Sequence, residues 1–270
     1  MAKKKNVQII YQDDQLLVIN KPSGTSVTKD RSGKKQLLDL LSDQLPTETI
    51  SALRLIHRLD KPTSGIMMLA KTKEAQSKYS HCFEKNLIEK TYLVLVTGFV
   101  PPKGFGQINA RIIPDRNKPG RMTLTRKKGK DAKTIWRLLA DYQSAALLAA
   151  QLVTGRTHQI RIHIPSIGLP LLIDPLYGSS KPVMLSDFKP RYRIAKHKEE
   201  EKPLIDRLTL HAYQLKFKEP QPDCPDHFIA PLDKNFKAAI KMITKHNPKG
   251  MDAFKNPEDF NKIINAELLD

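Results

Sequence analysis

One carboxylate of this 270-residue chain stands in a context suited to chemistry. Asp60 lies between Arg58 and Lys61 in the run His57-Arg58-Leu59-Asp60-Lys61-Pro62-Thr63-Ser64-Gly65. The two cations favour the ionised form of such a carboxylate, and Pro62 biases Lys61 toward extended backbone. An ionised carboxylate on a turn can act as a nucleophile or a base, but an Asp at a turn more often accepts backbone hydrogen bonds. Spacing and composition alone therefore favour a structural turn.

Metal chemistry has less support. His158 and His163 are five residues apart and would point to opposite faces of a strand, which is poor geometry for a shared metal. Cys82 and Cys224 form no CxxC pair, so we expect no thiolate zinc site, no disulfide framework and no cofactor. A glycosidase would need a second carboxylate, for which Asp174 is the candidate, and that alternative stays open.

Charge points to the class of partner. The chain has 46 Lys and Arg against 28 Asp and Glu, a formal charge of +18. This excess favours a polyanion, with nucleic acid ahead of an anionic membrane surface. The segment Arg111 to Lys133 alone has nine Lys and Arg against two Asp and is broken by Gly and Pro. We expect an exposed arm or hairpin that contacts RNA through Arg126, Lys127 and Lys128, rather than charge that is only solvated.

Composition also limits the class of protein. With 40% hydrophobic and 27% charged residues, the chain has enough apolar material for a sizeable core. It contains no run near the roughly 18 apolar residues of a membrane-spanning helix. We therefore expect a soluble, cytoplasmic protein without a membrane partner. We also expect a monomer, since no feature of the sequence implies a protein partner.

Strands and helices alternate along the chain in a mixed α/β order. Strands are expected at residues 7–11, 16–20, 53–59, 66–70, 92–96, 135–139, 145–153, 159–164 and 208–217. Helices are expected over 37–45, after a cap at Thr72, and over 233–244. The strand 159–164 would place Gln159, Arg161 and His163 on one face, and residues 181–202 are polar enough to be an insertion. Asp60 then lies at a strand end, before the next strand begins.

Several blocks of sequence together resemble one enzyme family. The run from His57 to Gly65, followed by Met67-Met68-Leu69-Ala70-Lys71-Thr72, is similar to the signature of RluA-type RNA pseudouridine synthases. Further blocks occur in the family's order: Asn20-Lys21-Pro22-Ser23-Gly24, Lys90-Thr91-Tyr92, Thr154 to His163, Gly168-Leu169-Pro170, Asp174-Pro175-Leu176-Tyr177-Gly178 and Leu210-His211-Ala212. The resemblance covers about residues 7 to 240 and reverses the structural reading of Asp60.

The resemblance implies a fold, an activity and a site. The fold is mixed α+β, with a bent, mainly antiparallel central sheet, flanking helices and a central RNA-binding cleft. The activity is the isomerisation of uridine to pseudouridine within rRNA or tRNA. Asp60 matches the essential aspartate, Tyr92 the aromatic residue stacked on the target base, and Arg161 the arginine paired with that aspartate. Arg58 matches a residue that fills the space left by the flipped base, and we expect His57, Thr63 and Arg156 to bind substrate.

The chain departs from the family pattern near Asp174. Ile173 stands where the family usually has Gly, and Leu171-Leu172 replaces a more usual Ile-Val or Ile-Leu. Because of these departures, the sequence does not determine the backbone conformation around Asp174. We expect a basic tail at residues 1–6, a catalytic domain at 7–245 and an extension at 246–270, without the small RNA-binding domain that some relatives have.

Two other functions remain as alternatives. An RNA-binding or ribosome-assembly protein could keep this fold without catalysis, although intact Asp60, Tyr92 and Arg161 argue against it. A base-excising glycosylase would release free uracil instead of rejoining it.

Overall fold

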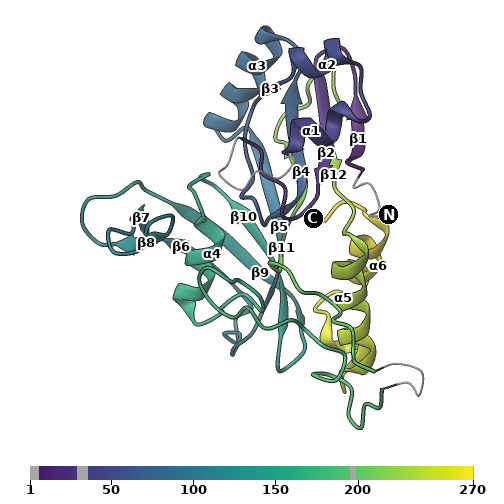
Figure 1. Ribbon diagram of the computed structural model, residues 1–270. Coiled ribbons are helices and arrows are strands. Elements are labelled where there is room, and N and C mark those ends of the chain that lie inside the picture. Colours follow the sequence, from purple (N-terminus) through teal and green to yellow (C-terminus); the bar gives the residue numbers. More distant parts are fainter. Residues whose placement is uncertain (1–5, 29–35, 195–198, 270) are drawn as a thin grey trace. The chain divides into compact units, whose positions relative to one another are not determined.

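The chain forms two compact units in a computed structural model that describes residues 6–28, 36–194 and 199–269 (Figure 1). The first unit comprises Met1–Thr91 and His211–Pro231, and the second comprises Tyr92–Leu210 and Leu232–Asp270. Strands β5 (Ile88–Val96) and β11 (Leu210–Phe217) each have residues in both units. The fold is mixed α/β, with mainly antiparallel sheet and flanking helices, as expected.

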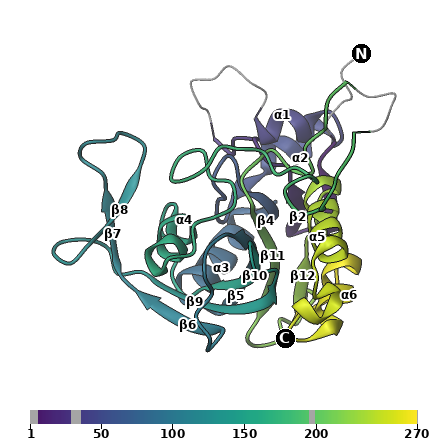
Figure 2. The same cartoon turned by 90° about the horizontal axis from the view of Figure 1, so that it is seen from below.

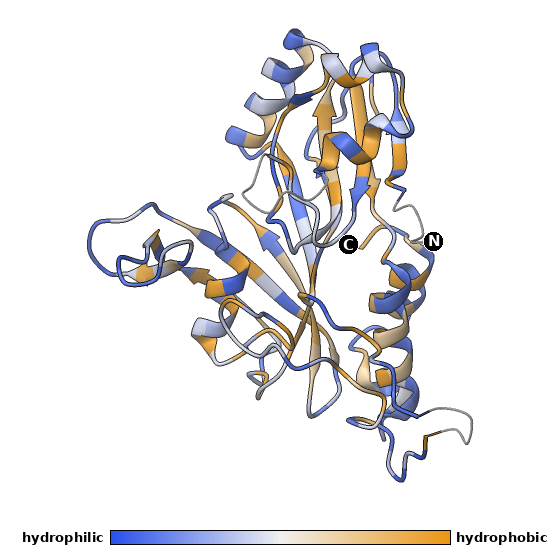
Figure 3. Ribbon diagram, in the orientation of Figure 1, coloured by the Kyte–Doolittle hydropathy of each residue, from blue (hydrophilic) through white to orange (hydrophobic). Residues whose placement is uncertain are grey.

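The first unit is built on strands in the order β1-β2-β4-β11-β5. Its elements before β5 are β1 (Gln8–Gln12), β2 (Leu16–Lys21), α1 (Leu37–Ser42), α2 (Thr47–Ala52), β3 (Arg54–Leu55), β4 (Ser64–Ala70) and α3 (Lys73–Glu84). β12 (His227–Ile229) pairs with β11, and β3 pairs with β4. The apolar side chains of β2 and β4 are buried and form the centre of this unit (Figure 3).

Two local predictions in the first unit are confirmed. The hairpin β1–β2 is closed by Asp13, whose carboxylate accepts the backbone N–H groups of Gln15 and Leu16 at 2.7 and 2.6 Å. Thr72 caps α3, because its hydroxyl accepts the N–H of Ala75 at 3.1 Å. The first two strands and the cap at Thr72 thus occur where the sequence predicts them.

The second unit contains a sheet in the order β5-β10-β9-β6 and a separate two-stranded hairpin, β7–β8 (Figure 2). Its elements are β6 (Phe105–Asn109), β7 (Arg111–Pro114), β8 (Met122–Thr125), β9 (Lys133–Asp141), β10 (Ala146–Leu152), α4 (Gln159–His163), α5 (Lys234–His246) and α6 (Pro257–Asn265), with 3-10 turns at Ile164–Ile167 and Gly250–Ala253. The mostly exposed segment Arg111–Lys133, expected as an arm or a hairpin, forms a hairpin, hereafter the basic hairpin.

The C-terminal residues pack on β9 of the second unit. The helix expected over 233–244 is α5, and Asp233 caps it by accepting the N–H of Phe236 at 2.9 Å. Past residue 246 the chain continues with α6, which the sequence analysis did not anticipate. Lys255 donates its N–H to the carbonyl of Leu139, and Asp259 pairs with Arg137 at 3.3 Å. Residues 246–269 are therefore a packed part of this unit.

The polar segment 181–202 contains no helix or long strand among its described residues. Val183 and Ile205 form an isolated bridge at its base. Residues 195–198 of this segment lie outside the described residues, as does all of the basic tail except Asn6.

Two expected strands are wrong. Residues 159–164 form helix α4 and the start of a 3-10 turn, because Gln159 and His163 both hydrogen-bond to β9 from successive helical turns. A six-residue alternation is too short to distinguish the period of a strand from that of a helix. Of residues 53–59, only Arg54 and Leu55 pair with β4, and the chain then forms a loop to Asp60.

Candidate functional site

Asp60 begins a tight turn immediately before β4. The N–H of Thr63 donates to the Asp60 carbonyl at 3.1 Å. The turn is held from the segment Lys21–Gly24: the Gly24 N–H donates to the Lys61 carbonyl at 2.9 Å, and the Ser23 hydroxyl to the Pro62 carbonyl at 2.6 Å. The family block Asn20 to Gly24 therefore supports the backbone of the turn that begins at Asp60.

Lys21 strengthens this support from inside the first unit. Its side chain is fully buried, and the ammonium donates to the carbonyls of Pro22, Thr25 and Lys61 at 3.1, 2.9 and 3.2 Å. A buried ammonium is stable only when its hydrogens are bonded, and here backbone oxygens meet that need. Lys21 thus fixes two loops to each other beside Asp60.

His57 lies three residues before Asp60 and is a half-buried residue that packs against β4 and α3. Its Nε2 accepts the backbone N–H of Met68 at 3.0 Å, and its ring stacks on Phe83 with centroids 4.2 Å apart. Burial, followed by the nearby charge of Lys90, lowers the pKa of His57 from 6.5 to about 3. The geometry gives His57 a structural contact with β4.

The end of this loop is fixed by a close approach of two strands. Gly65 pairs in parallel with Ala212, and a side chain at Gly65 would meet the Ala212 carbonyl oxygen at 2.1 Å. Ser64 hydrogen-bonds to Nδ1 of His211 at 2.9 Å, while Nε2 of His211 lies 3.0 Å from the Ala230 carbonyl. Only glycine fits at position 65. The Ser-Gly and Leu-His-Ala blocks are thus two sides of one strand pair.

The other candidates of the first unit differ in exposure. Arg58 is exposed and Asp60 partly buried. Thr63 is buried, and in the described part of the chain its hydroxyl has no hydrogen-bond partner. A buried hydroxyl without a partner retains its capacity to bond a substrate or a water.

Arg161 of the second unit is held by Asp174. Nε and Nη2 of the guanidinium donate to the two carboxylate oxygens at 2.8 Å each. The same carboxylate accepts the N–H groups of Leu176 and Tyr177 at 3.0 and 3.2 Å. This two-bond geometry fixes the plane of the guanidinium. The Asp174 block is therefore the support of Arg161.

The unusual Ile173 fits its position. Its side chain is fully buried, its backbone does not adopt positive φ, and its N–H donates to the Thr209 hydroxyl at 3.1 Å. No conformation reserved for glycine is needed there. The departure from the family pattern leaves the Asp174 turn intact.

Helix α4 uses its other polar residues for packing. The Gln159 side chain donates to the Lys133 carbonyl and the Thr134 hydroxyl, both at 2.9 Å, and accepts from Thr154 and the Arg156 N–H. His163 bridges Thr134 and the Ala110 carbonyl, and burial lowers its pKa. Arg161 is thus the residue of the block that is directed to Asp174.

Tyr92 and Arg156 complete the candidates of the second unit near the sheet. Tyr92 lies on β5 and packs, partly buried, against the apolar cluster of that sheet. Arg156 is exposed, and its Nε donates to the Asp131 carbonyl at 3.0 Å.

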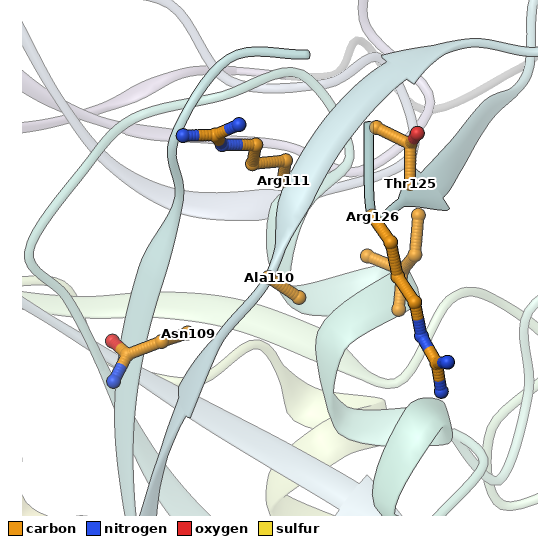
Figure 4. A pocket seen from close by; sticks show the side chains of 6 residues that line it. Asn109, Ala110, Arg111, Thr125 and Arg126 are labelled. Atoms are coloured by element: carbon orange, nitrogen blue, oxygen red, sulfur yellow. The ribbon is translucent and has the colours of Figure 1, made fainter. Parts of the chain in front are cut away.

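The basic hairpin has two shallow grooves at its base. One, of about 550 Å³, is lined by Asn109, Ala110, Arg111, Leu124, Thr125 and Arg126 (Figure 4). The other, of about 340 Å³, includes Arg111, Asp131 and Lys133. Arg111 braces the hairpin by donating to Asp131 at 2.7 Å and to the Lys127 carbonyl at 3.2 Å. Arg126, Lys127 and Lys128 are exposed, and Arg126 also lines the larger groove.

Comparison with known proteins decides the family. Residues 15–166 match the RNA pseudouridylate synthase family. The chain belongs to this family. It is 33% identical over 244 residues to the ribosomal large subunit pseudouridine synthase C of Buchnera aphidicola, covering 89% of this chain and 72% of the relative. It is 33% identical to the synthase D of Neisseria meningitidis, covering 97% of this chain and 67% of the relative.

Solved structures agree with the assignment. Human RNA pseudouridylate synthase domain containing 4 is 26% identical with a TM-score of 0.61, covering 87% of this chain and 92% of that one. The RluA-like resemblance, the fold class and the enzyme class, an isomerase acting on RNA, are thereby confirmed.

The candidate residues of this pseudouridine synthase fall into two sets. His57, Arg58, Asp60 and Thr63 lie in the first unit, whereas Tyr92, Arg126, Lys127, Lys128, Arg156 and Arg161 lie in the second. The structure establishes the surroundings of each set separately. The pairing of Asp60 with Arg161 stays a prediction.

Sequence reasoning missed the residues that support this site. Lys21 and Ser23 were noted only as part of a block, although a lysine between strand and Pro-Ser-Gly turn is a possible signal for a buried cation. Asp174 was considered as a glycosidase carboxylate and as part of a family block but not as a partner of Arg161, and its bond to Arg161 joins residues 13 positions apart across a turn. Such partners follow from tertiary structure, not from local pattern.

Proposed function

We propose that this enzyme converts a specific uridine of large-subunit ribosomal RNA to pseudouridine. The observation that supports it most directly is the Asp60 turn, which sits in the family's signature on a backbone held by Lys21, Ser23 and Gly24. The named relatives from Buchnera and Neisseria favour rRNA over tRNA as the substrate.

The reaction breaks the N1–C1′ bond of uridine, turns the uracil while it stays bound, and joins C5 to C1′. It requires neither redox nor phosphoryl chemistry. The target nucleotide first leaves its stack, at a cost of a few kcal/mol, which phosphate contacts and stacking offset. Asp60 either attacks C1′ or removes a sugar proton, and both routes need its carboxylate ionised.

Each remaining candidate has a role in this proposal. Tyr92 stacks on the flipped uracil and takes part in proton transfer from C5. Arg161, held in plane by Asp174, keeps the Asp60 carboxylate ionised and oriented. Arg58 fills the space vacated in the RNA, Thr63 and Arg156 bind the substrate, and His57 fixes the loop. The residues of the basic hairpin bind phosphates.

We also propose that the enzyme acts in the cytoplasm and as a monomer. Among residues 6–28, 36–194 and 199–269, no helix is long and apolar enough to cross a membrane. The segment 7–245 is proposed as the catalytic domain and 246–270 as its C-terminal extension.

The test is product analysis on RNA labelled in uridine. Purified enzyme is incubated with protein-free large-subunit rRNA, small-subunit rRNA and tRNA, and tritium release from C5 is followed by chemical mapping of pseudouridine. The proposal expects one or a few modified positions in large-subunit rRNA. Free uracil would indicate a glycosylase, and binding without tritium release would indicate a catalytically idle RNA-binding protein. Modification of tRNA alone would overturn the choice of substrate.

A further inference from the structure

Tyr177 connects three segments of the second unit. It follows Asp174 in the turn that supports Arg161, and its N–H donates to the Asp174 carboxylate at 3.2 Å. Its hydroxyl oxygen accepts the N–H of Met122, the first residue of β8, at 2.7 Å. The same oxygen lies 2.7 Å from Nδ1 of His158, which precedes helix α4. One side chain thus bonds to the basic hairpin and to the start of the Arg161 helix.

The ring of Tyr177 also contacts both the basic hairpin and helix α4. The guanidinium carbons of Arg121 and Arg161 lie 4.9 and 5.2 Å from its centroid. Arg121 belongs to the basic hairpin, and Arg161 belongs to α4. Cation–π contacts at these distances are attractive, more so where water is excluded. The ring therefore binds one arginine of the hairpin and the candidate arginine of the site.

The apolar contacts of the ring join the same parts. Tyr177 packs against a small cluster formed by Ile112, Ala132 and Ile162, with Met122 and Leu124 beside it. Ile162 lies on α4, and the other members belong to the basic hairpin. This cluster is separate from the larger one under the sheet, so the base of the hairpin depends on it for packing.

The Tyr177 hydroxyl makes hydrogen bonds that a phenylalanine at this position could not make. Met122 is opposite Pro114 in the register, and because the N–H of Asp115 donates to the Arg121 carbonyl at 3.0 Å, residues 114 and 122 form a non-hydrogen-bonded pair, in which the Met122 N–H points away from β7. The N–H of Met122 is instead bonded by the Tyr177 oxygen. Burial raises the pKa of Tyr177, so the phenol keeps its proton at neutral pH and can donate it to His158 when Nδ1 is unprotonated.

We propose that Tyr177 is a positioning residue that fixes the basic hairpin and Arg161 relative to each other. RNA held on the hairpin is then presented to an arginine whose place is set by the same side chain. The catalytic consequence of this proposal rests on the proposed function, whereas the structural connection does not. Arg121 belongs to the same connection through its contact with the Tyr177 ring. Its Nε is buried and has no hydrogen-bond partner within the described ranges.

The test compares three variants of the full chain. Tyr177→Phe removes the hydroxyl and keeps the ring, and Tyr177→Leu removes both. The matched control is Tyr11→Phe, which removes a hydroxyl bonded to Asp13 in the first unit. Two quantities are measured: hydrogen exchange of residues 122–125 and of α4, and the single-turnover rate of pseudouridine formation at saturating RNA. Thermal melting shows that each variant is folded.

In Tyr177→Phe, exchange at Met122 should become about tenfold faster, because one hydrogen bond to that amide is lost. The single-turnover rate at saturating RNA should fall at least about tenfold, because a displaced group of the site cannot be restored by more substrate. Tyr177→Leu should show larger effects on both, and Tyr11→Phe neither. If Tyr177→Leu does not fold, Tyr177→Phe decides the question.

Two outcomes would overturn the proposal. Unchanged exchange in Tyr177→Phe would show that the hydroxyl does not hold the hairpin. Faster exchange with a normal rate at saturation would show that the connection does not position Arg161. Should the wild type modify none of the RNAs tested, the proposed function fails, and hydrogen exchange alone still decides whether Tyr177 joins the hairpin to α4.

Discussion

The guanidinium of Arg161 and the carboxylate of Asp174 form two hydrogen bonds of 2.8 Å in a site where their side chains are only 3% and 2% exposed. A pair this buried is costly to break by removing one partner, since the other charge remains without compensation. Asp174 also closes its own turn through two backbone bonds. The pair thus fixes the position of Arg161, and Asp174 shapes the turn at residues 174–177, which follows α4 in the chain.

Asp174→Asn should destabilise the protein by about 3 to 5 kcal/mol, the usual cost of breaking a buried ion pair. Denaturant unfolding of wild type and variant measures the difference. The control is Asp187→Asn, whose partner Lys181 is 74% exposed, and which should cost less than about 1 kcal/mol. Equal effects of the two substitutions would contradict the structural role of Asp174.

The basic hairpin should contribute directly to RNA affinity. Replacing Arg126, Lys127, Lys128 and Lys130 by Gln should weaken binding and reduce the slope of log K against log salt by up to about 3, because fewer counterions are released. The backbone contacts that brace the hairpin at Lys127 and Lys130 do not need these side chains.

The matched control for the hairpin removes the same number of charges from α5, by Gln at Lys234, Lys237, Lys241 and Lys245. This variant should leave the salt slope close to that of the wild type. If both quadruple variants changed the slope equally, affinity would follow net charge and not the hairpin.

Tyr92 should be required for turnover beyond its packing. The side chain is partly buried against the sheet cluster, so Tyr92→Leu keeps an apolar contact and loses the flat ring for stacking. Turnover at saturating RNA should drop by at least about a hundredfold with a small change in melting temperature. A loss of activity in proportion to a loss of stability would assign Tyr92 to the core.

His57 gives the protein a defined pH dependence of stability. Its pKa is lowered from 6.5 to about 3 by burial, so below pH 6.5 the unfolded chain binds a proton that the folded chain does not. The free energy of unfolding should therefore fall as pH decreases from 6.5 toward 3, by at most about 1.4 kcal/mol per pH unit from this residue.

Comparison with His57→Gln isolates this contribution, because the buried His163 titrates in both proteins. The variant should lose less stability than the wild type between pH 6.5 and 4. Parallel pH profiles of the two proteins would mean that His57 is not the group responsible.

Local signals in the sequence predicted those parts of the fold that local interactions determine. Thr72 caps α3 where the pattern indicates, α5 lies where a helix was expected over 233–244, and β1 and β2 match the expected strands 7–11 and 16–20. Helix α4 was predicted as a strand, because its buried polar residues obtain their partners from β9, far away in the sequence. Helix α6 was missed for the same reason: it is fixed by contacts to β9.

The residues of the candidate site likewise divide into those that local sequence predicts and those that it does not. The Asp60 turn and the exposed cations of the basic hairpin could be predicted from neighbouring residues. The supports could not, since Lys21 bonds to Lys61 across 40 positions and Tyr177 to Met122 across 55. Family blocks indicated where these supports lie, but the contacts themselves required the structure.

The central claim is that the Asp60 carboxylate performs the chemistry, and Asp60→Asn tests it most directly. The substitution keeps the shape and hydrogen-bonding capacity of the side chain and removes its negative charge. Pseudouridine formation and RNA affinity are measured on the same purified variant at fixed salt, with melting temperature as the control for folding. We predict that the rate falls by several orders of magnitude while affinity and melting temperature stay near those of the wild type. A near-native rate, or a joint loss of folding and activity, would contradict the account.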